Sequence, residues 1–194
     1  MIMKKVEKGQ PGYLDYKKKY EIVRTLIYFA IVAAVFFLGV WQTHSRKNLL
    51  TVVAVVGCLP ASKALVGLIT RFPYKSISRK LANDIIGRSK HITCIFDMVL
   101  TSTEKFMPVE CIVISGNTIF GYAPNEKTDL KYTADFIKEI LGMNRIKNIN
   151  IKLFRELNAF NARVDGLNSI AAVEKEDLKE AEEKIAGLIL NVSI

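Results

Sequence analysis

Two long apolar runs near the start of the chain constrain its fold more than any other feature. Residues 22–41, IVRTLIYFAIVAAVFFLGVW, carry no charge after Arg24, and residues 49–70 form a second run interrupted only by Pro60 and Lys63. At about 1.5 Å of rise per residue, a helix of twenty residues is about 30 Å long, which is the thickness of the hydrocarbon core of a bilayer. The sequence therefore predicts two transmembrane helices.

The short connection between these helices, residues 42–48, predicts an antiparallel hairpin. Lys and Arg residues lie on both outer flanks of the two runs and are sparse in the connection. The positive-inside rule then places both termini in the cytoplasm, in a multi-pass protein of a plasma membrane that fits a bacterial cell. The cations that we expect to contact anionic lipid headgroups are Lys17, Lys18, Lys19, Arg71, Lys75, Arg79 and Lys80.

The second run also predicts how the two helices pack. Small residues recur along one of its faces at spacings of three and four, which permits close approach of the first helix near Ala30, Ala33 and Ala34. At 100° per residue, Lys63 points away from this face. It is the intramembrane polar candidate: it either extends its amine toward water or contacts another subunit. The predicted helix-packing residues are Ala54, Gly57, Ala61 and Ala64.

The charge distribution argues against nucleic-acid binding. The net charge is +9, but residues 1–90 hold 16 Lys and Arg against four Asp and Glu, whereas residues 91–194 hold 12 against 15. The basic excess therefore flanks the apolar runs, and the remaining domain is mildly acidic, unlike a nucleic-acid-binding surface. We predict the following regions: a basic cytoplasmic tail, flexible or lying on the headgroups, at 1–20, transmembrane helices at 21–41 and 49–72, an external loop at 42–48, a basic juxtamembrane helix at 73–90 and a cytoplasmic α+β domain at 91–194.

Alternating apolar residues predict about four mostly antiparallel strands in this domain, with three to four helices. The expected strands are 91–101, 109–115, 117–123 and 147–153, with a two-residue turn at Gly116-Asn117. Helical spacing predicts a juxtamembrane helix at 76–88, a helix capped by Thr128 or Asp129, a helix over 153–167 with a turn at Asp165-Gly166 near its end, and a last helix at 173–190. The inward residues expected on this last helix are Leu178, Ala181, Ile185, Leu188 and Ile189. In the first strand, one face is expected to carry Ile92, Cys94, Phe96, Met98 and Leu100. The second and third strands have apolar residues on both faces. They are either covered by helices of this chain or left open for self-association or a protein partner.

The order helix, three strands, helix, strand resembles the core order of restriction-endonuclease-like enzymes. That resemblance, which covers element order only, implies a metal held by an Asp and a Glu-x-Lys pair at strand ends. Here Asp97 lies within a strand, Glu104 and Lys105 are adjacent in a turn, and residues 117–123 contain no acidic residue. The candidate catalytic residues under this hypothesis are Asp97, Glu104, Lys105 and Glu110.

The spacing of the candidate residues does not match a complete catalytic set, so the sequence favours a non-enzymatic role. We expect a membrane scaffold, adaptor or regulatory protein that binds a protein partner or itself, with no cofactor or metal and without nucleic acid. Two alternatives stay open. One is a membrane-anchored hydrolase with a degenerate nuclease-like core, and the other is an oligomeric channel or transporter accessory subunit.

Overall fold

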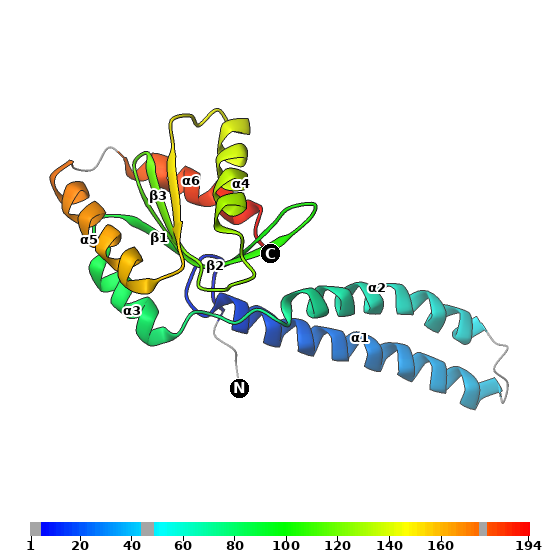
Figure 1. The fold of residues 1–194 in the computed structure, drawn as a ribbon. Helices are drawn as coiled ribbons and strands as arrows, with labels where there is room; N and C mark the ends of the chain where they lie inside the picture. Colours follow the sequence, from blue (N-terminus) through cyan, green and yellow to red (C-terminus); the bar gives the residue numbers. More distant parts are fainter. Residues whose placement is uncertain (1–4, 44–48, 175–177) are drawn as a thin grey trace. The chain divides into compact units, whose positions relative to one another are not determined.

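A computed structural model describes residues 5–43, 49–174 and 178–194 (Figure 1). The chain forms two compact units. The helix pair consists of Asp15–Pro73, and the domain consists of Met1–Leu14 together with Tyr74–Ile194. The chain passes between the units twice, directly after Leu14 and directly before Tyr74.

The helix pair contains α1 (Tyr13–Thr43) and α2 (Leu49–Arg71), both long and apolar enough to cross a membrane. Helix α1 begins earlier than expected, directly after Gly12, whose φ of +91° ends the preceding loop. Residues 13–20, predicted as part of a loose tail, are therefore helical. Helix α2 continues through Pro60 and ends two residues before Pro73, which lacks the N–H needed to extend it.

Small residues of α2 lie against α1. Ala54, Ala61 and Ala64 are buried, and a Cβ added at Gly57 would lie 3.1 Å from a methyl group of Val32. The partner face on α1 was predicted only in part, because Ala30 and Ala34 are exposed, whereas Ala33 borders the groove between the two helices. The inward positions of α1 instead recur every seven residues, as in supercoiled helix pairs: Thr25, Val32 and Gly39.

The domain is built on a four-stranded sheet in the order β1-β2-β3-β4. The strands are β1 (Thr93–Thr101), β2 (Phe106–Ser115), β3 (Thr118–Tyr122) and β4 (Asn150–Phe154). The first three are antiparallel neighbours, with the predicted turn at Gly116-Asn117 between β2 and β3. Strand β4 runs parallel to β3, because helix α4 (Leu130–Met143) carries the chain back along the sheet before β4 begins.

Helices cover both faces of this sheet (Figure 1). Helix α4 and helix α6 (Lys179–Asn191) contribute Ile137, Leu141, Ile185 and Ile189 to the core cluster on one face. Helix α3 (Arg79–Arg88) and helix α5 (Leu157–Glu174) contribute Ile85, Phe160 and Val164 to the cluster on the other. Of the two alternatives that the sequence left open, the structure shows the sheet covered by helices of this chain, and the fold is α+β with a mixed sheet.

Several helix boundaries differ from the prediction for local reasons. Helix α3 begins at Arg79 rather than Ser76, because the side chain of Ser78 caps it by accepting a hydrogen bond from the N–H of Leu81. Helix α4 begins after Asp129, one of the two predicted caps, whose carboxylate accepts from two backbone N–H groups. Helix α5 runs through Asp165-Gly166, where the sequence predicted a turn, and continues to Glu174.

The alternation of side chains along β1 changes at Asp97. Ile92 and Phe96 belong to the α3/α5 core, whereas Met98 and Leu100 belong to the α4/α6 core, so the prediction of one shared face is wrong. Asp97 has a φ of +55°, a left-handed conformation that shifts the alternation by one residue. The facing strand shifts at the same level. Cys111 and Val113 contribute to one core, and Val109 and Ile112 contribute to the other.

Segments from the two ends of the described chain lie along the edge strand β1. The carbonyl of Gly9 accepts a 2.8 Å hydrogen bond from the N–H of Phe96, and the N–H of Ile194 donates 3.0 Å to the carbonyl of Val99. Lys8 joins the two segments by donating to the carbonyl of Ser193 at 2.6 Å. Residues 8–14 are thus part of the domain and differ from the expected free tail.

Candidate functional site

The four candidate catalytic residues lie in two separate places. Asp97 and Glu110 occupy facing positions at the centre of β1 and β2, between the Phe96–Cys111 and Met98–Val109 pairs. Glu104 and Lys105 are exposed in the turn that begins at Ser102. Ser102 is five positions after Asp97, about 16 Å along the strand at 3.3 Å per residue.

Asp97 is buried, with 2% of its surface exposed, and its carboxylate accepts hydrogen bonds from two distant segments. The N–H of Gly12 donates to Oδ2 at 2.7 Å, and the N–H of Ile77 donates to Oδ1 at 2.8 Å. The side chain of Ser76 and the backbone of Leu14 also bond to this carboxylate. We call this arrangement the Asp97 junction. It joins the segment that precedes α1 to the segment that follows α2.

Burial governs the electrostatics of the junction. It raises the pKa of Asp97, although the hydrogen bonds from Ile77, Ser76, Gly12 and Leu14 oppose that rise by stabilising the charged form. Burial also raises the pKa of Glu110, and the negative charge of Asp97 adds to the effect. Two carboxyl groups on neighbouring strands therefore each have a raised pKa.

This geometry fits a structural role, in which hydrogen bonds to Asp97 hold two segments of the chain together, better than a metal centre. Both oxygens of Asp97 are engaged by backbone donors, which leaves this side chain poorly placed to ligate a cation. Within the described residues, no group of three or more His, Cys, Asp and Glu side chains is positioned to hold a metal ion. The sequence showed that an aspartate interrupts an apolar strand. It did not show that Gly12 and Ile77 bond to this aspartate, because they do so through their backbone N–H groups.

A second buried carboxylate, Glu182, fixes helix α6 to the sheet. It accepts 2.7 Å from the hydroxyl of Thr93 and 2.8 Å from the N–H of Gly116, at the turn between β2 and β3. Sequence reasoning missed it because it placed Leu178 and Ala181 on the inward face of this helix. Both of these residues are exposed, and the inward face instead carries Glu182 and Ala186.

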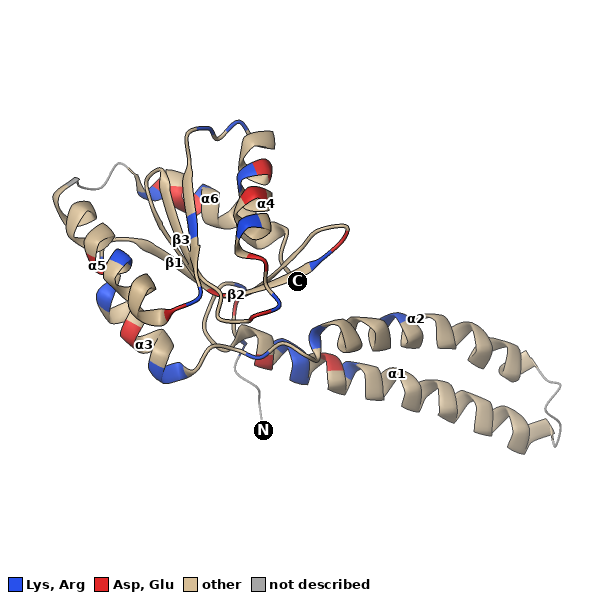
Figure 2. Cartoon of the chain, viewed as in Figure 1, with Lys and Arg blue, Asp and Glu red and all other residues tan. Residues whose placement is uncertain are grey.

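Most charged residues of α1 and α2 lie near the end where α1 begins and α2 ends, as Figure 2 shows. Glu21 is buried there and lies 3.8 Å from Lys17 and 3.6 Å from Arg24. The amine of Lys18 lies 5.5 Å from the ring centre of Phe72. Of the other predicted lipid contacts, Lys19, Lys75, Arg79 and Lys80 are exposed, and so is Lys63 on α2.

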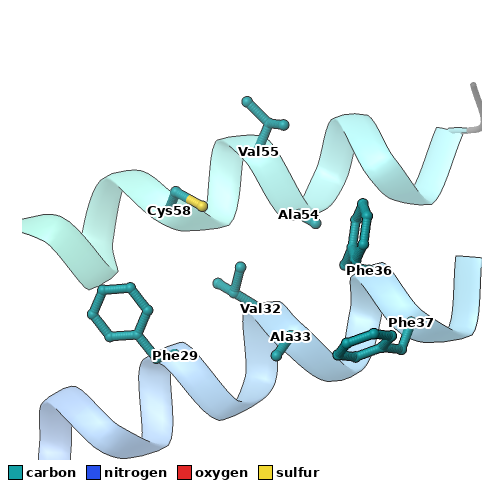
Figure 3. Close-up of a pocket in the computed structure, with 8 residues that line it drawn as sticks. All are labelled: Phe29, Val32, Ala33, Phe36, Phe37, Ala54, Val55 and Cys58. Carbon is teal, nitrogen blue, oxygen red and sulfur yellow. The ribbon is translucent and has the colours of Figure 1, made fainter. Parts of the chain in front are cut away.

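Farther along the pair, an apolar groove of about 280 Å³ lies between the helices (Figure 3). Phe29, Val32 and Phe36 border it from α1, and Ala54 and Cys58 border it from α2.

Cys58 is exposed, Cys94 is half-buried and Cys111 is buried, and all three are free thiols. Burial raises the pKa of Cys94 to about 11, so this thiol is protonated at neutral pH.

Comparisons of the chain with protein-family models, with curated proteins and with solved structures found no match.

Proposed function

We propose that the protein is a non-enzymatic scaffold, adaptor or regulatory protein, anchored in a plasma membrane by α1 and α2. Its domain lies on the cytoplasmic side and binds a protein partner or a second copy of the chain. The Asp97 junction carries this proposal. Because Gly12 precedes α1 and Ile77 follows α2, their shared acceptor requires both flanks of the helix pair to lie on the same side of any membrane that the helices cross.

The basic residues that flank the helix pair support the proposal that the domain lies on the cytoplasmic side. Lys19, Lys75 and Arg79 are exposed close to the two ends of the helix pair, where cations favour the anionic inner leaflet. The links are also short: Leu14, bonded to Asp97, directly precedes the helix pair, and three residues separate Pro73 from Ile77. A domain so closely tethered at both ends suits a protein that works at the membrane surface.

Exposed apolar side chains support a binding role. The domain leaves Ile170 and Val173 of α5 with 54% and 81% of their surfaces exposed, and Ile86 of α3 with 47%. These two helices contact each other on one face of the sheet (Figure 1). Exposed apolar side chains mark protein-binding surfaces where they form a contiguous patch, and the crosslinking experiment below tests whether these residues do.

Labelling of introduced cysteines tests the topology, with the parent that carries only Cys58→Ser as the control for labelling of Cys94 and Cys111. In a Cys58→Ser background, Lys5→Cys and Asn125→Cys should react with a membrane-impermeant maleimide only from the cytoplasmic side, and Gln42→Cys only from the other side. Labelling of Lys5→Cys and Asn125→Cys from opposite sides would refute the anchor arrangement.

Crosslinking in native membranes tests the binding role. The parent should give a defined crosslinked complex that is lost in an Ile170→Ser/Val173→Ser variant, while Ser169→Ala, on the same helix, retains it. The purified full-length protein should not hydrolyse nucleic acid or nucleotides with Mg²⁺ or Mn²⁺. Hydrolysis that disappears in Glu110→Gln would favour the hydrolase alternative instead.

A further inference from the structure

The contacts within the helix pair place Lys63 at the level of Arg24. Gly57 of α2 lies against Val32 of α1, and Lys18 near the start of α1 lies against Phe72, just past the end of α2. In an antiparallel pair, the numbers of two residues at the same level have a constant sum, which these two contacts set at 89 or 90. Position 63 is therefore level with position 26 or 27. Arg24 is then no more than about 5 Å away along the helix axis, at 1.5 Å per residue.

We infer that the boundary of the hydrocarbon core crosses the helix pair at Arg24 and Lys63, and that both cations contact lipid phosphates there. This inference rests on the membrane anchoring proposed above. It assigns to Lys63 a lipid headgroup as its partner, in place of water alone or another protein subunit.

Both cations are available for this contact. Lys63 is exposed and has no hydrogen bond or ion pair with any other residue in the described part of the chain. Arg24 is also exposed, with its guanidinium 3.6 Å from Glu21 and its Nε 3.4 Å from the hydroxyl of Tyr28. These long contacts leave N–H donors free for a phosphate oxygen, which arginine and lysine bind well.

The residues on either side of this level fit the boundary. From Arg24 to Trp41, seventeen steps of helix extend about 25 Å, close to the thickness of a thin hydrocarbon core. Trp41 is 77% exposed, and tryptophan favours the interface at the far end of such a span. On the other side, Lys17, Lys18, Lys19 and Glu21 crowd two turns of α1. Ionisable groups at that density are costly in hydrocarbon and tolerated among headgroups.

Depth-dependent fluorescence quenching tests the boundary. In a Trp41→Phe background, tryptophan is placed at Leu59 or Val66, exposed positions on opposite sides of Lys63 along α2. The full-length protein is reconstituted in phosphatidylglycerol/phosphatidylcholine vesicles that carry a quencher at mid-chain or at the headgroup. We expect the mid-chain quencher to act most strongly on Leu59→Trp and the headgroup quencher on Val66→Trp.

Each outcome of this measurement is informative. Equal, strong mid-chain quenching at both positions would overturn the inferred boundary and leave the membrane anchor intact. Quenching of neither tryptophan by either lipid would refute the anchor itself.

A second measurement tests the phosphate contact. The preference of the protein for spin-labelled phosphatidylglycerol over phosphatidylcholine should fall in Lys63→Gln by up to about fivefold, since one cation near the surface is worth about 1 kcal/mol. Lys138→Gln, at an exposed position on α4 of the domain, is the matched control and should keep the parent's preference. An unchanged preference in Lys63→Gln would overturn the inference.

Discussion

The backbone N–H of Ile77 donates a 2.8 Å hydrogen bond to the carboxylate of Asp97, twenty residues later in the chain. The same carboxylate accepts from Gly12, on the far side of both apolar helices in sequence. One side chain in the middle of a strand therefore satisfies backbone donors from two connecting segments that have no regular secondary structure to do so. A buried N–H without a partner is costly, which makes Asp97 central to the stability of the domain.

Replacing Asp97 with glycine should destabilise the domain strongly. Glycine accepts the positive φ but removes the acceptor of two N–H groups, each worth about 1–3 kcal/mol when left unpaired. Asp97→Asn keeps one acceptor oxygen and a residue that tolerates this φ, so its loss should be smaller. Denaturant unfolding in detergent, followed by near-ultraviolet circular dichroism, measures both variants. Equal stability of Asp97→Gly and the parent would show that the hydrogen bonds of the Asp97 junction do not stabilise the domain.

The pH dependence of stability should reflect Glu110. Its folded pKa is raised above the ordinary value of 4.5, so the folded state holds this proton more tightly than the unfolded state. The resulting stability is present below about pH 4.5 and is lost as the pH rises through the folded pKa. The raised pKa of Asp97 acts in the same direction.

Glu110→Gln should therefore make the decline in stability between pH 4 and pH 7 shallower and raise the melting temperature at pH 7. Melting temperatures at half-unit pH steps would show the change. Glu104→Gln, in the exposed turn, controls for the removal of one negative charge. A decline as steep as the parent's in Glu110→Gln would contradict this electrostatic account.

Glu182 should matter through its two hydrogen bonds rather than through its charge. Glu182→Ala leaves the N–H of Gly116 and the hydroxyl of Thr93 without their acceptor and should cost about 2–4 kcal/mol. Glu182→Gln keeps an oxygen for Gly116 and an amide that donates to Thr93, so it should cost less than half as much. Glu183→Ala, exposed on the same helix, is the control, and hydrogen exchange at Gly116 reports the bond directly. A Glu182→Ala variant as stable as this control would refute the assignment.

Two glycines near the N-terminus offer a matched pair. Gly9 and Gly12 both have positive φ, +87° and +91°, so alanine at either position should cost about 1–2 kcal/mol. At Gly9 the new Cβ would also lie 3.1 Å from a methyl group of Leu190, whereas at Gly12 nothing lies within 4 Å. We expect Gly9→Ala to unfold at a lower denaturant concentration than Gly12→Ala. If both variants matched the parent, residues 8–14 would be the loose tail that the sequence predicted.

Sequence patterns predicted the elements whose signals are local. The length of the apolar runs, the turn at Gly116-Asn117 and the cap at Asp129 each depend on a few neighbouring residues. The face of β1 that Met98 occupies depends instead on the left-handed backbone at Asp97, which alternation does not reveal.

The site was harder to predict than the fold for a similar reason. Asp97 stood out as an acidic residue in an apolar strand, and catalysis was one hypothesis for it. Its partners are backbone groups of Gly12 and Ile77, and a backbone donor leaves no trace in residue type. Glu182 was missed because five of the first six residues of α6 are charged, and such a run gives no sign of which residue turns inward.

The hydrogen bonds along β1 also set an order of events during synthesis. Gly12 leaves the ribosome 85 residues before Asp97, and both apolar helices are made in between. At roughly 5–20 residues per second, the N-terminal segment waits several seconds for its partner. The N–H of Ile194, which donates to Val99 on the same edge, is made 95 residues after Val99, so this part of the edge stays uncovered in the meantime, and an uncovered edge strand invites pairing with other chains. A defect in the helix pair that holds residues 9–12 away from β1 should leave more of this edge uncovered and should therefore appear first as aggregation of the nascent domain.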